Sequence, residues 1–439
     1  MLSFCLISAA LAGSTAGMGL APLGGAFGGI TEPGVLGLAT TPAAARPSQS
    51  EIALDFGLSR WAIDAQLDGE APVQGQGTTP MPYLGAAMPL GDFGIGFVGA
   101  VPFGGGGSFP EDGAQRFHLR EGKVFLMEAS LAVAYQPVDA LRVGVAARAA
   151  RGSMMKRYAV DSAGLLNSRL SGETTAPEGE PLLEGHQELD VSGLGYGYAV
   201  GLSGFLDSGI EIHASYRSPL KVDLSGPARV TPSDDIDLAL AGTAEATMVY
   251  PREVNLGAVF PAGPVRLMLD GGWTDWSSME RVDGTLKDVS IESDDEAMTA
   301  LLLATGLNES SLTAPQDIYN DLGNHSVFFG GAGVDIPLHA RWTLRTGAWW
   351  APTTIPEENF HVGILDFNAL DVRGGLAWMP STSLTVAGSI DHYVIPDRNI
   401  RKSSLSLTNE PTSGRVLPSA NGDYAMKANR YGLTVIYRL

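Results

Sequence analysis

Residues 253–276 read EVNLGAVFPAGPVRLMLDGGWTDW, and this stretch shows how most of the chain is built. Apolar residues alternate with polar residues or glycine on both sides of the Pro-Ala-Gly-Pro segment at 261–264. This period of two around a tight turn predicts a β-hairpin with one apolar face. Similar hairpins recur almost to the last residue, so we expect a chain dominated by antiparallel sheet.

The composition agrees with sheet and excludes one class of partner. Of the 439 residues, 44% are hydrophobic, 17% are charged and 56 are glycines, which suit tight turns and close strand packing. The net charge of −20 leaves no basic stripe for a phosphate backbone, so nucleic acid is not expected as a partner.

The N-terminus predicts export. Residues 1–16, MLSFCLISAALAGSTA, form an apolar run followed by small residues, as in a cleaved signal peptide. Cys5, the only cysteine of the chain, lies inside this run, so the mature protein would contain no disulfide. No later apolar stretch reaches the roughly 18 residues of a membrane helix. An integral membrane protein with this sequence must therefore be a barrel.

Residues 17–50 differ from the rest of the chain. They are rich in glycine, alanine and proline, carry only Glu32 and Arg46 as charges, and show no clean period. A disordered linker is usually more polar. We therefore predict a compact plug inside the barrel, which we call the hatch, and assign residues 51–439 to the barrel.

Turns alternate between two kinds from residue 51 onward. Six are short, at residues 88–92, 136–139, 206–209, 261–264, 337–340 and 379–382. Seven polar segments are longer, at residues 64–78, 103–122, 152–192, 218–246, 278–324, 353–366 and 396–426. Six short turns and seven long loops predict an all-β, 14-stranded antiparallel transmembrane β-barrel.

The ends of the strands support an outer-membrane location in a Gram-negative bacterium. The last strand alternates up to Leu439, which suits recognition by barrel-assembly machinery, and we expect a monomer surrounded by outer-membrane lipid. Tryptophans near strand ends, at 273, 276, 342, 349, 350 and 378, predict an interfacial girdle, with core packing as the alternative. Residues 294–307 in the longest loop predict a short amphipathic helix.

Several motifs together resemble the outer-membrane long-chain fatty-acid transporters and related hydrocarbon channels, the FadL/TodX family. Thr41, Pro42 and Ala43 stand where that family has Asn-Pro-Ala at the end of its hatch. Four further segments match in order, namely ASYRS at 214–218, YPREV at 250–254, WTDWS at 273–277 and LRTG at 344–347. The departures are Thr41 in place of asparagine, the missing terminal phenylalanine and the helical insertion near 294–307.

The resemblance implies passive diffusion of a fatty acid or other hydrophobic small molecule. The ligand would be captured at the external loops, pass the hatch and leave sideways at a kink in the third strand. The sequence supports a kink, because Gly99, Pro102, Gly104 and Gly105 interrupt a well-alternating strand, and proline cannot donate to a ladder. The alternative is that the strand simply ends there.

Alternation also assigns the residues that face the lumen. Arg148, Arg217 and Arg345 fall on the inward side of their strands and are candidates to bind a ligand carboxylate. Arg148 is the favoured one, because it lies toward the external end of its strand beside small residues. A structural role for each arginine is the alternative, since polar lumens are ordinary in barrels.

Enzymatic motifs are missing from the sequence. It contains no Gly-x-Ser-x-Gly, no His-Glu-x-x-His and no paired Cys or His at metal spacing, so we expect no catalytic residues, no metal and no cofactor. Asp391 and His392 are adjacent, but neighbours on a strand point to opposite faces. A general porin or a structural barrel is the alternative function, followed by an outer-membrane hydrolase.

Overall fold

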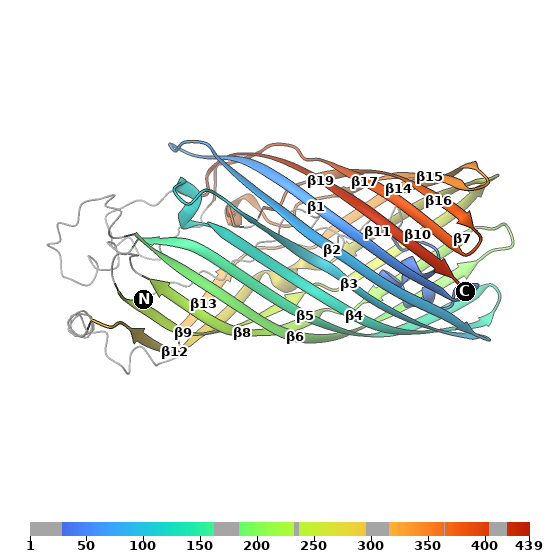
Figure 1. Cartoon of the computed structure of the whole chain (residues 1–439), viewed down its shortest axis with the longest axis horizontal. Coiled ribbons are helices and arrows are strands. Elements are labelled where there is room, and N and C mark those ends of the chain that lie inside the picture. Colours follow the sequence, from blue (N-terminus) through green and yellow to red (C-terminus); the bar gives the residue numbers. More distant parts are fainter. Residues whose placement is uncertain (1–28, 162–183, 232–236, 296–315, 364, 404–418) are drawn as a thin grey trace.

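The computed structural model describes residues 29–161, 184–231, 237–295, 316–363, 365–403 and 419–439. Its strands join into one sheet in which β1 (Glu51–Leu67) pairs with β2 (Val73–Leu90) and also with the last strand, β19 (Gly422–Arg438). The sheet therefore closes on itself into a barrel (Figure 1). Within the described residues, the helices are too short to cross a membrane.

Consecutive strands are neighbours in the barrel and run antiparallel. Those made of one piece are β1, β2, β19, β3 (Phe93–Ser108), β4 (Glu121–Val138), β5 (Leu141–Asp161), β6 (Glu184–Phe205), β15 (Trp342–Ala351) and β16 (Ala369–Ser381). Five are made of two pieces, namely β7 (Glu211–Arg217) with β8 (Leu220–Thr231), β9 (Ala239–Tyr250) with β10 (Glu253–Ala262), β11 (Val265–Thr274) with β12 (Arg281–Glu292), β13 (Gln316–Asp321) with β14 (Val327–His339), and β17 (Leu384–Val394) with β18 (Arg398–Ile400). The 19 elements thus form 14 strands, which confirms the predicted fold class.

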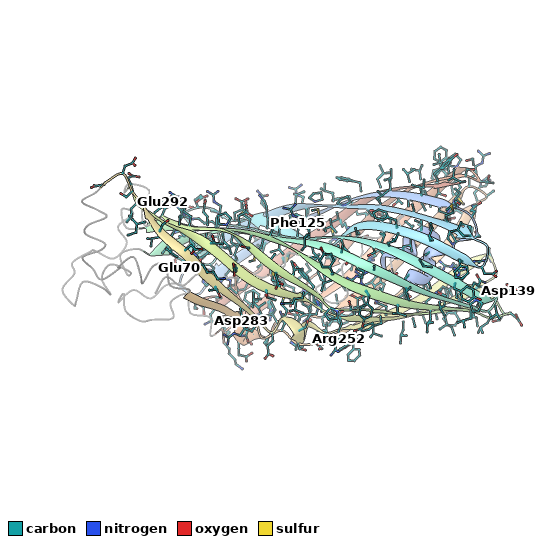
Figure 2. The ribbon with its side chains drawn as sticks, turned by 90° about the horizontal axis from the view of Figure 1, so that it is seen from below. Glu70, Phe125, Asp139, Arg252, Asp283 and Glu292 are labelled. Carbon is teal, nitrogen blue, oxygen red and sulfur yellow. The ribbon has the colours of Figure 1, made fainter. Side chains whose placement is uncertain are left out.

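The strands are longer than the sequence predicted, while all six short turns lie where expected. β5 and β6, with 21 and 22 residues, extend into both ends of the predicted loop at 152–192, and β8 and β9 occupy most of the predicted loop at 218–246. About 9 to 11 residues suffice to cross a bilayer, so these strands continue beyond it with polar sequence. In Figure 2, Asp139 in a short turn lies at the opposite end from Glu70 and Glu292.

Side chains alternate between lipid and lumen as predicted. Leu54 and Phe56 on β1 are more than half exposed, whereas their neighbours on the strand are buried. Trp342, Trp350 and Trp378 face outward and fit the predicted girdle. Trp276 does not fit it, because its side chain is only 4% exposed and lies inside the barrel.

Four neighbouring strands are interrupted at one level of the wall. β7 ends at Arg217, which pairs with Glu253 at the start of β10. Glu253 also pairs with Thr274 at the end of β11, so three of the interruptions lie side by side. Pro219 and Pro251 occupy two of the interruptions, where they cannot donate a ladder hydrogen bond. After β11 the chain forms the 3₁₀ helix η5 (Trp276–Met279), which turns two buried side chains into the lumen.

The described part of the predicted hatch, residues 29–50, lies inside the barrel near the short turns (Figure 1). It contains two 3₁₀ helices, η1 (Gly34–Ala39) and η2 (Pro42–Ala45), whose side chains are almost all buried. Both helices contact strands of the β1–β6 side of the barrel. The predicted signal peptide, residues 17–28 and most of the predicted helix at 294–307 lie outside the described residues.

Candidate functional site

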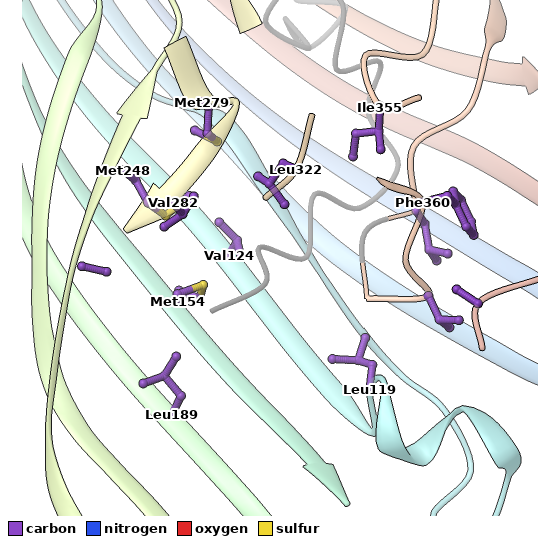
Figure 3. Close-up of a cluster of buried hydrophobic side chains, with 14 of the residues drawn as sticks. Leu119, Val124, Met154, Leu189, Met248, Met279, Val282, Leu322, Ile355 and Phe360 are labelled. Carbon is purple, nitrogen blue, oxygen red and sulfur yellow. The ribbon is translucent and has the colours of Figure 1, made fainter. Parts of the chain in front are cut away.

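The inward-facing side chains change from apolar to charged at a common level of the barrel. On β4, Leu126 and Glu128 are both buried, and Glu128 is the one nearer the short turns. On β19, Ala428 and Arg430 are related in the same way. The external apolar layer includes Leu67 and Tyr424. It also includes the side chains labelled in Figure 3, namely Leu119, Val124, Met154, Leu189, Met248, Met279, Val282, Leu322, Ile355 and Phe360. The charged layer beneath it contains Asp55, Glu128, Arg148, Arg217, Glu253, Asp270, Arg345, Asp371, Arg373, Asp391 and Arg430.

The third strand is interrupted on one side only, at the boundary of these two layers. β3 keeps its pairing with β4 up to Ser108, with a bulge between Ala100 and Phe103. Its pairing with β2 stops at Ala100 and resumes only at Ser108. The strand therefore does not end at its glycines, but part of it has no neighbour on the β2 side.

The sequence of β2 explains this gap. Pro80 and Pro82 lie opposite the unpaired part of β3, and their side chains face outward. β1 pairs with β2 without a break across both prolines, so their nitrogens point toward β3. Two donors that β3 needs are therefore absent.

The residues predicted as a lateral gate take different positions around this gap. Gly99 still pairs with both neighbouring strands, just before the bulge. Pro102 lies in the bulge, while Gly104 and Gly105 pair with β4 but not with β2. Their role as a gate stays a prediction.

Trp61 covers one end of the gap from inside. Its Nε1 donates to the carbonyl oxygen of Gly106 at 3.3 Å, a group on the unpaired stretch of β3. A Cβ atom at Gly77 or Gly107 would lie within 2.5 Å of the Trp61 indole. These two glycines therefore make room for an indole that extends from β1 to β3.

The predicted hatch residues pack on glycines of the wall. A Cβ at Gly144 on β5 would lie 2.4 Å from the carbonyl carbon of Pro42 and 2.5 Å from the nitrogen of Ala43. A Cβ at Gly201 on β6 would lie 2.1 Å from Oγ1 of Thr41. The Thr-Pro-Ala segment thus lies directly on backbone that only glycine allows.

Arg148 and Arg217 share one carboxylate. Nε and Nη2 of Arg148 donate to Glu128 at 2.9 and 2.6 Å, and its Nη1 donates to the carbonyl oxygen of Ser218 at 2.9 Å. Arg217 also donates to Glu128 and, through Nη1, to the carbonyl oxygen of Ala39 at the end of η1. Both arginines face the lumen as expected, and both have partners within the protein.

A second set of contacts joins the start of the hatch segment to the opposite wall. Arg345 pairs with Glu32 and with Asp335. Thr31 donates its hydroxyl to Asp270 at 2.8 Å, and its carbonyl oxygen accepts from Arg266 at 2.6 Å. The hatch segment is therefore held by polar contacts from several sides.

Two external loops fold into the mouth of the barrel and meet there. The backbone N–H of Gly363 donates to Nδ1 of His361, so the proton of this neutral imidazole is on Nε2. Nε2 of His361 donates that proton to Nδ1 of His118, with 3.3 Å between the two nitrogens. Both imidazoles are 1% exposed. Burial, together with His118 and Lys156, holds the pKa of His361 well below its ordinary value of 6.5. Among the described residues, no three His, Cys, Asp or Glu side chains converge as metal ligands would.

The sequence carries local signals for some of these residues. Two prolines one residue apart in a strand, as at 80 and 82, are a signal for a broken ladder that was available. Its place near a strand end predicts that Trp276 belongs to the girdle, yet that end is an interruption inside a longer strand. Alternation along β4 also turns Glu128 inward, so the period of two is the signal that could have found it.

Comparison with known proteins now identifies the family. The chain belongs to the family described as outer membrane protein transport protein (OMPP1/FadL/TodX), whose model matches residues 44–439. It is thus an outer-membrane protein of a transport family, as the resemblance implied. No curated protein sequence matches the chain.

Solved structures share the fold at low sequence identity. A FadL homologue of Pseudomonas aeruginosa is similar with a TM-score of 0.77 and 16% identity over 99% of both chains. The toluene transporter TodX of Pseudomonas putida has a TM-score of 0.67 and 15% identity over 92% of this chain and 94% of its own. The Ralstonia pickettii toluene transporter TbuX has a TM-score of 0.63 and 15% identity over 97% of both chains.

Proposed function

We propose that the protein carries out passive uptake of long-chain fatty acids or similar hydrophobic small molecules across the outer membrane. The ligand is captured at the external loops, enters the external apolar layer and leaves sideways through the gap between β2 and β3. The observation that carries this proposal is the position of the gap, which opens where the apolar layer meets the charged layer.

Physical chemistry favours the sideways route. A ligand that moved on through the charged layer would have to enter a region of buried ion pairs, which are costly to separate. A ligand that reached the periplasm would expose its apolar surface to water at roughly 25 cal/mol per Å². Movement through the gap into lipid avoids both costs.

The arginines have a structural role in this proposal. A fatty-acid carboxylate could bind Arg148 only by displacing Glu128, which already accepts two hydrogen bonds from that guanidinium. We propose instead that Arg217 and Arg345 hold the hatch through Ala39 and Glu32, that Arg148 fixes the Glu128 carboxylate which Arg217 shares, and that residues 17–50 block the periplasmic half of the lumen. Assembly by barrel-assembly machinery and a monomeric state stay predictions of the sequence.

Uptake by whole cells tests the proposal. Bacteria that lack their own channel for hydrophobic compounds would express the protein and be given labelled oleate, toluene or sucrose. We expect faster entry of oleate or toluene and no entry of sucrose, because a large cluster of buried apolar side chains lies on the external side of the described interior and buried ion pairs lie on its periplasmic side. Entry of sucrose without oleate or toluene would support a general porin. Removal of residues 19–47 should let sucrose enter as well, while the sideways route for oleate or toluene stays intact.

A further inference from the structure

Two irregular parts of the wall meet inside the lumen through three aromatic rings. The ring centroid of Phe103, just after the bulge in β3, lies 5.2 Å from that of Tyr250 and 5.5 Å from that of Trp276. Tyr250 ends β9 and Trp276 begins η5, so both belong to the interrupted strands. These strands are five and six positions away from β3 in a barrel of 14, so the contact spans the lumen.

Trp276 has an unmet hydrogen-bond donor at this contact. Its Nε1 is buried and has no acceptor within the part of the chain that the structure describes. A buried indole N–H usually finds a partner, because an unsatisfied buried donor is destabilising. The inward turn of η5 therefore presents a donor for which the described part of the barrel supplies no acceptor.

The surroundings of Trp276 indicate what the missing acceptor is. Trp276 belongs to the cluster of buried apolar side chains that forms the external apolar layer, and Phe103 packs against the same cluster. An oxygen atom on an otherwise apolar molecule satisfies the donor and matches the cluster.

We propose that Phe103, Tyr250 and Trp276 form a subsite for the oxygen-bearing end of an apolar ligand, with Trp276 Nε1 as the hydrogen-bond donor. This inference rests on the proposed uptake function and narrows its substrate class. The ligand has an apolar body and one exposed acceptor, as in an aryl ketone, an ester or a fatty acid. A pure hydrocarbon leaves the donor unmet and binds less tightly, since a site built to hydrogen-bond a ligand discriminates against the analogue without the polar atom.

A matched pair of ligands tests the subsite. Binding of octanophenone and octylbenzene to the detergent-purified full chain would be measured by calorimetry for wild type and for Trp276→Phe, which keeps an aromatic ring and removes the N–H. We expect about tenfold weaker binding of the ketone and unchanged binding of the hydrocarbon. Trp378→Phe, a change in the outward-facing girdle, should alter neither affinity.

Two further variants separate the donor from packing. Trp276→His supplies an N–H on a smaller ring and should restore part of the preference for the ketone. Phe103→Leu removes one ring of the subsite and should weaken both ligands by about threefold to tenfold. Heat-modifiable gel migration verifies that each variant is folded.

The outcomes distinguish this inference from the proposed function. Equal affinities of wild type and Trp276→Phe for the ketone, or equal losses for both ligands, would overturn the subsite and leave uptake untouched. If wild type binds neither ligand and cells take up neither oleate nor toluene, the proposed function itself is wrong.

Discussion

Arg345 on β15 pairs with Glu32, which lies 313 residues earlier in the chain, with 3.1 Å between Nη2 and Oε2. The same guanidinium contacts Asp335 on β14, with 2.9 Å between Nε and Oδ1. Glu32 and Arg345 are only 4% and 7% exposed. One cation thus connects the segment inside the barrel to two strands of the wall.

Neutralising Glu32 should loosen the hatch segment. Glu32→Gln keeps the size of the side chain but removes its charge, and a hydrogen bond to a charged group contributes roughly 1.5 to 3 kcal/mol. We expect faster hydrogen exchange in residues 29–50 and more frequent open events in single-channel recordings. Glu70→Gln, at an exposed site, is the control, and equal exchange in both variants would contradict this role of Glu32.

A side chain at Gly144 should displace the Thr-Pro-Ala segment. Val at this position would place its Cβ 2.4 Å from the carbonyl carbon of Pro42, a distance that only movement of the backbone relieves. Gly388→Val is the matched control, because a Cβ there meets nothing within 4 Å. We expect higher ion conductance for the first variant alone, and unchanged conductance would show that the segment does not block the pore.

Arg148→Ala distinguishes a structural arginine from one that binds the ligand. Because Glu128 and Ser218 already engage the guanidinium, we expect similar affinity changes for palmitic acid and for hexadecane. A loss of roughly 1.5 to 3 kcal/mol for the acid alone would instead assign the carboxylate to Arg148. Calorimetry with the detergent-purified protein measures both affinities.

Acid should weaken the contact between the two external loops. His361 is neutral when folded, and its folded pKa is lower than its unfolded pKa of about 6.5. The unfolded form therefore binds more protons below that pH, so loop stability is full above pH 6.5 and falls as the pH drops toward the folded pKa. Limited proteolysis should cut the 353–366 loop faster at pH 5.5 than at pH 7.5.

Substitution of the histidine tests the cause of this pH dependence. His361→Gln retains an acceptor and a donor but does not titrate, so its cleavage rate should be the same at both pH values. The exposed His339→Gln should behave as wild type. A pH dependence that persists in His361→Gln would place the titrating group elsewhere.

The sequence predicted the barrel because its signals are local. Each short turn and the alternation beside it, as at 261–264, can be recognised within one hairpin, and their number determines the number of strands. Which charged side chains form an ion pair is not a local property. The pairing of Glu32 with Arg345 follows only from the closed barrel, because the two residues are far apart in the sequence. Strand length was underestimated for a related reason, since β5 and β6 continue with polar sequence beyond the membrane.

Restoring the donors of β2 tests the lateral exit. Pro80→Val combined with Pro82→Val returns two N–H groups that point toward the unpaired part of β3. Each ladder hydrogen bond formed stabilises the closed wall by about 0.5 to 1.5 kcal/mol. We expect hydrogen exchange of residues 101–107 to slow and uptake of hydrophobic ligand by cells to fall by about tenfold, while binding to the purified protein stays unchanged.

Pro89→Val is the control for this experiment, because Pro89 lies on the same strand where the pairing with β3 is regular. Its uptake should equal that of wild type. Slow exchange at 101–107 together with normal uptake in the double variant would show that the wall had closed and that the ligand leaves by another route. A fall in uptake that is matched by a loss of binding would place the effect on capture, because the gap lies beyond the external apolar layer where the ligand is first held.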